Sequence, residues 1–375
     1  NAVSYLKLRG SIGSLGNQSG IPNYSFLTKY DGEGKITRYG NPDLKWETTT
    51  QTNIGIEAGL FRIKTYLTAH YFVKNTKDIL LGVALPKLVG QVDATFVNAG
   101  KVRNQGFELS LSVRDKTSGG FGYNVTGNIG TVKNEVIALH RTVPALIGPV
   151  SRAVVGQPID VYYGYVMEGI YQNQAEITAH QSGLPNPTSK PGDIKFKDLN
   201  GDGLITDADR TYMGSAIPKF TYGFTASIDY KGFDFSFMLQ GVGKVNRYNE
   251  SKQIMDYDTR PFNHTTAVLN SWKGEGTSNT IPRSTFTDNG SSRVSSIFVE
   301  NASYFRLKNA EIGYSFGTLM KKANLGVQNL RLYVSGQNLF TVTDYTGLDP
   351  EVADQRDMGT YPQSRAVLLG VNVTF

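Results

Sequence analysis

The sequence predicts an all-β fold, namely a transmembrane antiparallel β-barrel with long extracellular loops. Three observations carry this prediction. Apolar and polar residues alternate with a period of two in about ten segments, which places successive side chains on opposite faces of a strand. The connections between these segments are short and long in turn. No stretch of the 375 residues approaches the roughly 18 uncharged apolar residues that a membrane-spanning helix requires.

The segment 220–230 shows the alternation most clearly. One face would carry Phe220, Tyr222, Phe224, Ala226, Ile228 and Tyr230, and the other Thr221, Gly223, Thr225, Ser227 and Asp229. The strands expected on this criterion cover 3–13, 50–61, 62–75, 107–114, 119–133, 220–230, 233–240, 303–316, 328–341 and 366–375. A soluble β-sandwich would show the same alternation, with the apolar face buried in a core.

The lengths of the connections favour the membrane barrel over the sandwich. Short connections are expected near Leu60–Arg62, Asp115–Gly120, Tyr230–Phe233 and Phe316–Asn329, and long ones at 14–49, 76–104, 134–218, 244–302 and 342–364. Outer-membrane barrels join their strands by short periplasmic turns and long extracellular loops, whereas a compact soluble domain rarely carries many long loops. The sequence therefore predicts a location in the bacterial outer membrane and contact with its lipid.

The final expected strand fits this orientation, because it would run inward and end at the periplasmic rim. Its outward apolar row would consist of Val367, Leu369, Val371, Val373 and Phe375. A terminal aromatic residue after alternating apolar residues resembles the signal that the outer-membrane assembly machinery reads. The alternative interpretation is an ordinary closing strand.

Composition excludes several other classes of protein. The formal net charge is +6, and Lys and Arg are scattered singly along the strand-like segments, so nucleic-acid binding is not expected. Cys is absent, which removes disulfides and thiolate chemistry. The four His residues lack metal-ligand spacing, and no nucleophile elbow or phosphate-binding loop occurs, so the chain is not expected to be an enzyme. The first residues show no initiator Met or signal peptide, which suggests a missing N-terminal part.

Several segments together resemble the C-terminal third of the SusC/RagA family of TonB-dependent outer-membrane transporters of Bacteroidetes. The segments are LKLRGS at 6–11 with GNQ at 16–18, NPDLKWE at 41–47, NAGKVRNQGFEL at 98–109, GDIKFKDLNGDG at 192–203, YFRLKN at 304–309 and GQNLF at 336–340. The resemblance spans nearly the whole chain.

The resemblance implies that residues 1–375 form the C-terminal portion of such a barrel, about the last 10 of 22 strands, without the plug domain and the earlier strands. Family members import bulky nutrients, glycans, oligosaccharides or peptides, together with a SusD-like surface lipoprotein that acts as a lid. Contact with TonB would lie in the missing N-terminal part. The alternative function is a passive porin, or a structural or adhesive outer-membrane barrel.

One motif inside the expected loop 134–218 predicts a metal site. Residues 198–209 follow the spacing of an EF-hand calcium loop, in which oxygen donors recur at fixed positions and a glycine, here Gly203, permits the sharp turn. The expected ligands of Ca²⁺ are the side chains of Asp198, Asn200, Asp202, Thr206 and Asp209 and the carbonyl of Leu204. Its role would be structural, because no flanking helices are apparent. The alternative is a metal-free turn built from Asx hydrogen bonds.

Aromatic residues fall into two groups. Those near the expected strand ends would form interfacial girdles: Tyr71, Phe72, Tyr230, Phe316 and Phe340. Those in the long loops would pack against a lid protein, shape the loops or stack on sugar rings: Tyr162, Tyr163, Tyr165, Tyr171, Trp272 and Tyr361.

Overall fold

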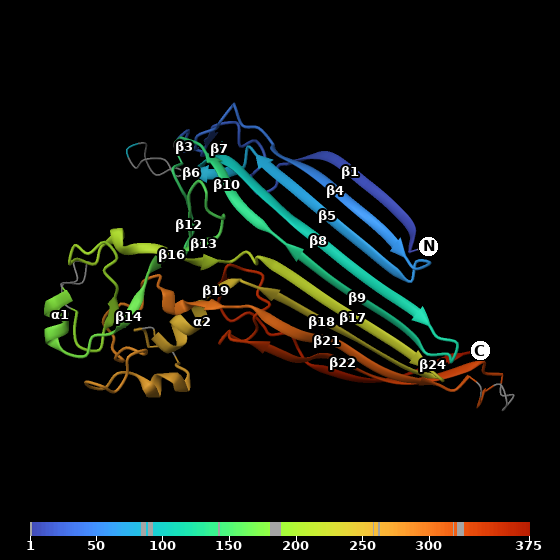
Figure 1. The fold of residues 1–375 in the computed structure, drawn as a ribbon. Helices are drawn as coiled ribbons and strands as arrows, with labels where there is room; N and C mark the ends of the chain where they lie inside the picture. Colours follow the sequence, from blue (N-terminus) through green and yellow to red (C-terminus); the bar gives the residue numbers. More distant parts are fainter. Residues whose placement is uncertain are drawn as a thin grey trace.

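A computed structural model gives the fold, and it describes residues 2–83, 88, 93–141, 143–180, 189–257, 259–261, 263–317, 319–320 and 326–375. Its main feature is one curved antiparallel sheet in which ten strands follow each other in the order β1-β4-β5-β8-β9-β17-β18-β21-β22-β24, and β10 adds to β8 (Figure 1). Each strand on this path pairs with its neighbour along the path, as in an up-and-down barrel wall. Strands β1 and β24 form the two edges, so the sheet is an open part of a barrel.

The ten expected strands are confirmed, and most extend further into the extracellular connections than predicted. Their bounds are β1 Val3–Asn17, β4 Glu47–Leu60, β5 Thr65–Lys77, β8 Gly100–Lys116, β9 Gly122–Thr131, β17 Phe220–Tyr230, β18 Phe233–Gly243, β21 Tyr304–Ser315, β22 Asn329–Thr343 and β24 Ala366–Thr374.

The pairing register gathers the apolar rows on one face of the sheet. Paired residues on adjacent antiparallel strands point to the same side. Leu369 pairs with Val334, Val334 with Ile312, Ile312 with Phe235, and Phe235 with Ile228, so one apolar row crosses five strands. These side chains remain accessible, for example 80% for Leu369 and 54% for Ile312. A continuous exposed apolar face of this kind is the lipid-facing side of a membrane barrel.

The opposite face is polar and carries paired charges. Arg331 donates to Asp234 at 2.9 Å and to Glu311 at 2.6 Å, and these three residues lie on three adjacent strands. Arg9 pairs with Glu57 on the neighbouring strand in the same way. Charges on the lipid side would be costly, and this face is therefore the inner wall of the barrel.

The alternation of short and long connections is confirmed in the described part of the chain. At one end of the sheet, Lys231 and Gly232 link β17 to β18 with φ values of 48° and 90°, the two positive angles of a type I′ hairpin turn. The long connections all leave from the other end (Figure 1). Residues 84–87 and 89–92 of the second long connection and 181–188 of the third lie outside the described residues.

The predicted loop 134–218 is partly wrong at its start. Residues Lys133–Leu139 form β10, which pairs with β8 beyond the point where β9 ends, so the barrel wall continues upward there. The cause is a local irregularity at Gly106, where a Cβ would approach the carbonyl oxygen of Thr131 to 1.8 Å. Period-two reasoning did not resolve a strand that resumes after one unpaired residue.

The extracellular connections contain small sheets and short helices. The strands are β2 Lys29–Tyr30, β3 Ile36–Arg38, β6 Leu80–Val83, β7 Thr95–Asn98, β11 Leu146–Ile147, β12 Arg152–Ala153, β13 Val161–Tyr165, β14 Met167–Ile170, β15 Ile194–Phe196, β16 Arg210–Ser215, β19 Asn246–Asn249, β20 Val299–Asn301 and β23 Arg356–Asp357. The helices are α1 Gln174–His180, α2 Glu250–Lys252, the π-helix Gln253–Tyr257 and the 3₁₀ turns Asp207–Asp209, Thr266–Asn270 and Ser296–Phe298. Among the described residues, no helix has the length and apolarity needed to cross a membrane.

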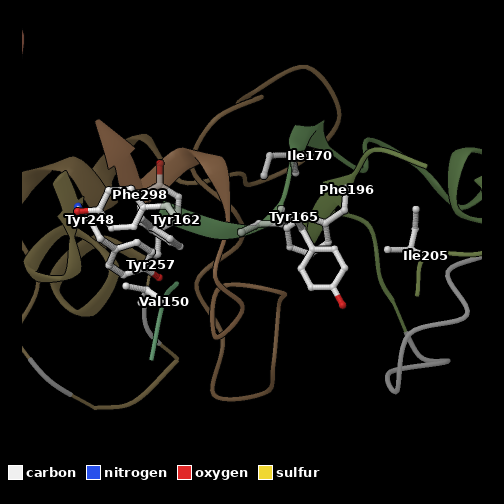
Figure 2. Close-up of a cluster of buried hydrophobic side chains, with 10 residues drawn as sticks. Val150, Tyr162, Tyr165, Ile170, Phe196, Ile205, Tyr248, Tyr257 and Phe298 are labelled. Atoms are coloured by element: carbon white, nitrogen blue, oxygen red, sulfur yellow. The ribbon is translucent and has the colours of Figure 1, made fainter. Parts of the chain in front are cut away.

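The third and fourth long connections share a hydrophobic core, which makes them one cap. Figure 2 shows ten buried side chains of this core in two neighbouring groups, with Tyr162, Tyr248 and Phe298 in one and Tyr165 and Phe196 in the other. The ring centroids of Tyr165 and Phe196 lie 5.3 Å apart. Each fully buried side chain of this size contributes about 1.5–3 kcal/mol. We call this assembly the loop cap.

Candidate functional site

The last long connection, residues 344–365, lies against the inner wall of the barrel. Arg306 of β21 points inward, since it pairs with Gln240 and Thr341 on the polar face. Its guanidinium donates to Asp349 at 2.6 Å and to Glu351 at 2.7 Å, and both acceptors belong to this connection. We call residues 344–365 the inner loop.

Arg306 is the main electrostatic anchor of the inner loop. Its side chain is only 2% exposed, and a buried cation requires paired anions because removing it from water costs several kcal/mol. Burial alone would raise the pKa of Asp349, but the backbone N–H groups of Glu351 and Gln363 and the Arg306 guanidinium outweigh it and lower that pKa. Lys308 adds a further contact to Glu351 at 3.1 Å.

The far end of the inner loop docks onto the loop cap. The Tyr162 hydroxyl donates to the backbone oxygen of Gln355 at 2.6 Å and accepts from the backbone N–H of Tyr248 at 3.2 Å. Arg356 forms a two-point ion pair with Glu250. The inner loop therefore bridges the barrel wall and the cap.

A cavity of about 450 Å³ lies between the inner wall, the inner loop and the third long connection. The register places Glu47, Thr76, Val102 and Asn104 of its lining on the inner face of β4, β5 and β8. The rest of the lining is Ile79, Leu81, Leu146, Ile147, Gly148, Ser151, Ala153, Ile159, Asp160 and Gln355. The volume falls in the range of about 300–1,000 Å³ that is usual for ligand sites. We call it the vestibule cavity.

The predicted calcium residues lie together in one tight turn of the loop cap. The two carboxylate oxygens of Asp198 accept from the backbone N–H groups of Gly201 and Gly203, both at 2.8 Å. These hydrogen bonds, the Gly203 one first, lower the pKa of Asp198. Asp202 accepts from the backbone N–H of Leu204 at 2.8 Å.

Asp209 closes the same turn from the buried side. It is 0% exposed, and its carboxylate accepts from the backbone N–H groups of Leu199 at 2.9 Å and Thr206 at 2.7 Å. Asn200 donates from its amide to Asp202. Among the described residues, no group of three or more carboxylate or His side chains converges in metal-binding geometry. The donor types suit calcium, and the hydrogen bonds described above close the turn by themselves, so the calcium site stays a prediction.

The aromatic residues of the long connections serve different roles. Tyr162, Tyr165 and Tyr171 are 0%, 6% and 1% exposed and belong to the cap interior, which confirms the loop-structure interpretation for them and excludes ligand stacking. Burial raises the pKa of each of the three hydroxyls to about 12. Tyr361 is 87% exposed.

Arg306, Gln355 and the vestibule cavity were not found from the sequence. Arg306 stands within the YFRLKN segment, which was used only for the resemblance. Its inward position could have been read from the neighbours Phe305 and Leu307, which fall on the apolar face. The residues that meet it, Asp349 and Glu351, lie more than 40 positions away, and sequence gives no sign of that contact.

Comparison with known proteins identifies the family of this wall. Residues 2–339 match the family model described as "TonB dependent receptor-like, beta-barrel". The chain belongs to this family. TonB-dependent receptor barrels of this kind lie in the outer membrane, which confirms the predicted location and the resemblance.

Similar proteins include TonB-dependent receptor P3 of Formosa agariphila, which is 32% identical over the whole chain, and TonB-dependent receptor SusC of Bacteroides thetaiotaomicron, which is 26% identical over the whole chain. The chain covers 40% and 38% of these two proteins, so it spans about two fifths of the length of such TonB-dependent receptors. A solved structure titled "Structure of the RagAB peptide transporter" matches the whole chain with a TM-score of 0.82 and 24% identity, and 41% of that chain is covered. This likeness confirms the fold as the C-terminal portion of a TonB-dependent barrel.

Proposed function

We propose that this chain forms the C-terminal wall of a barrel that imports bulky nutrients, glycans, oligosaccharides or peptides, in a TonB-dependent manner. A surface lipoprotein of the SusD type would cover the extracellular side, and TonB would act on the plug domain of the whole protein. Membership of the TonB-dependent receptor family supports the energised step. The relatives named SusC and RagAB support the lipoprotein partner and the size of the ligand.

The observation that carries this proposal is the inner loop fixed to the inner wall. Because Arg306 holds residues 344–365 against the wall, a solute that enters the mouth meets a shaped, polar surface. A surface of this kind suits selective capture before transport. It suits free diffusion through a wide aqueous pore less well, which is the property of a passive porin.

Uptake by cells that carry the full-length receptor tests this proposal. We expect accumulation of labelled oligosaccharides or peptides to stop when the proton-motive force is dissipated and when the TonB-contacting segment is deleted, while the receptor level in the outer membrane stays unchanged. Uptake that continues in both cases would support the porin alternative. Co-purification of a surface lipoprotein with the receptor tests the partner separately.

A further inference from the structure

The vestibule cavity combines an aliphatic lining with two unpaired acids. Its apolar part consists of Ile79, Leu81, Val102, Leu146, Ile147, Ala153 and Ile159, and no aromatic ring belongs to the lining within the described part of the chain. A sugar ring exposes hydroxyl groups around its edge, and each would lose water against aliphatic carbon without a partner. A hydrocarbon chain would be favourable on the same surface.

The two acids of the lining have no cation beside them. Glu47 comes from the inner wall at the start of β4, and Asp160 comes from the third long connection. Among the residues that the structure describes, neither carboxylate forms an ion pair or a side-chain hydrogen bond. Desolvation raises the pKa of Asp160, and an approaching cation would offset that cost.

A third polar group of the lining lacks a partner as well. The side-chain Nε2 of Gln355 is buried and donates no hydrogen bond, whereas its backbone oxygen is held by Tyr162. A buried donor without an acceptor costs about 1–3 kcal/mol, so an acceptor supplied by a ligand would be favourable there. The lining thus offers hydrocarbon contacts, a donor and two negative charges.

We infer that the vestibule cavity is a cation-selecting subsite, which takes a ligand segment with an aliphatic stem and a positively charged end, such as a lysyl or arginyl side chain. The stem packs on the aliphatic wall, the charge lies between Glu47 and Asp160, and the Gln355 amide donates to a carbonyl of the ligand. This subsite rests on the proposed import function, because it selects what the receptor captures.

Binding to the full-length receptor tests the subsite. The probes are short peptides that differ at one position only, lysine, norleucine or glutamate, together with a neutral oligosaccharide. We expect the lysine peptide to bind about tenfold more tightly than the norleucine peptide and the glutamate peptide to bind most weakly. Glu47→Gln and Asp160→Asn should each reduce the lysine preference about threefold, and the double variant should remove it.

Two controls separate the subsite from general effects. Glu33→Gln changes an exposed acid in the first long connection, outside the cavity lining, and should leave the preference unchanged. If a variant does not assemble, the wild-type receptor still provides a test, because a charge-based preference for lysine must decline as salt concentration rises. A salt-independent preference overturns the inference.

The results also distinguish the subsite from the import function. Equal affinity for lysine and norleucine peptides, or tight binding of the oligosaccharide that the double variant leaves unchanged, overturns the subsite and leaves energised import in place. Selective binding of the lysine peptide together with uptake that ignores the proton-motive force overturns the import function and leaves the subsite in place.

Discussion

The guanidinium of Arg306 is almost fully enclosed on the inner wall, where two carboxylates of one loop compensate it. A cation in this position does little for the stability of the sheet, because the strands are already held by their backbone ladder. It fixes the position of the inner loop instead. Removal of the cation would leave Asp349, which is 6% exposed, buried without its charge partner.

We expect Arg306→Met to detach the inner loop. Breaking a buried ion pair by removing one partner costs about 3–5 kcal/mol, and the loop can escape this cost by moving into water. Limited proteolysis of the full-length receptor should show faster cleavage within 344–365. Lys308→Met is the matched control, because Lys308 contacts only Glu351 of this loop and is half-buried, and its effect should be small. Equal cleavage rates of wild type and Arg306→Met would contradict the anchoring role.

The calcium prediction belongs to the same scale. If residues 198–209 bind Ca²⁺, the purified receptor should contain the metal, and the double substitution Asp198→Ala with Asp202→Ala should reduce the metal content by one ion per chain. Asp31→Ala is a suitable control, because Asp31 also accepts backbone N–H bonds in an exposed turn outside the predicted loop. Metal content that the double substitution leaves unchanged would remove the prediction and leave the Asx turn as the full explanation.

At the scale of elements, the loop cap depends on tyrosines that are neutral when buried. Burial raises the pKa of Tyr162, Tyr165 and Tyr171 to about 12, whereas an unfolded tyrosine titrates near about 10. The folded cap therefore retains more protons than the unfolded chain between these values. The resulting stability is fully present below the unfolded pKa and is lost as the pH rises through the folded pKa.

We expect the cap to loosen between about pH 10 and 12, while the barrel wall remains intact. Ultraviolet absorbance of tyrosinate should show a late ionisation phase, and near-ultraviolet circular dichroism should change over the same range. Tyr162→Phe should reduce the late phase and weaken the attachment of the inner loop, since the hydroxyl holds the backbone oxygen of Gln355. A single phase near about 10 for all tyrosines would contradict the buried arrangement.

At the scale of the whole molecule, the ten-stranded wall has two open edges, β1 and β24. In a membrane each unpaired backbone N–H and C=O at such an edge costs several kcal/mol, so open edges are not tolerated in lipid. The wall needs further strands to close. This requirement agrees with the share of two fifths that the chain covers in its relatives.

We therefore expect residues 1–375 alone to fail to form a closed, heat-modifiable barrel in detergent. Co-refolding with the earlier strands of the full protein, supplied as a separate chain, should restore heat modifiability and protease resistance. A monomeric, heat-modifiable barrel formed by residues 1–375 alone would show that the edges can pair with each other.

The sequence by itself determined the wall of this protein. Strand positions, the lipid-facing rows and the alternation of connection lengths follow from a period of two and from turn lengths, and both are local properties that each segment carries without its neighbours. The same reasoning missed β10, because one unpaired residue shifts the pattern. The motif at 198–209 was also local, and its turn was confirmed although its metal stays a prediction.

Only the tertiary structure decided how the extracellular connections are arranged. The contact between Tyr162 and Gln355 joins positions 193 residues apart, and the contact between Arg306 and Asp349 turns a predicted surface loop into a lining of the inner wall. A loop has no periodic pattern that states which distant residue it will meet, so Tyr162 looked equally suited to a lid, a ligand or a core. The vestibule cavity depends on these contacts, because its lining combines three connections with the inner wall.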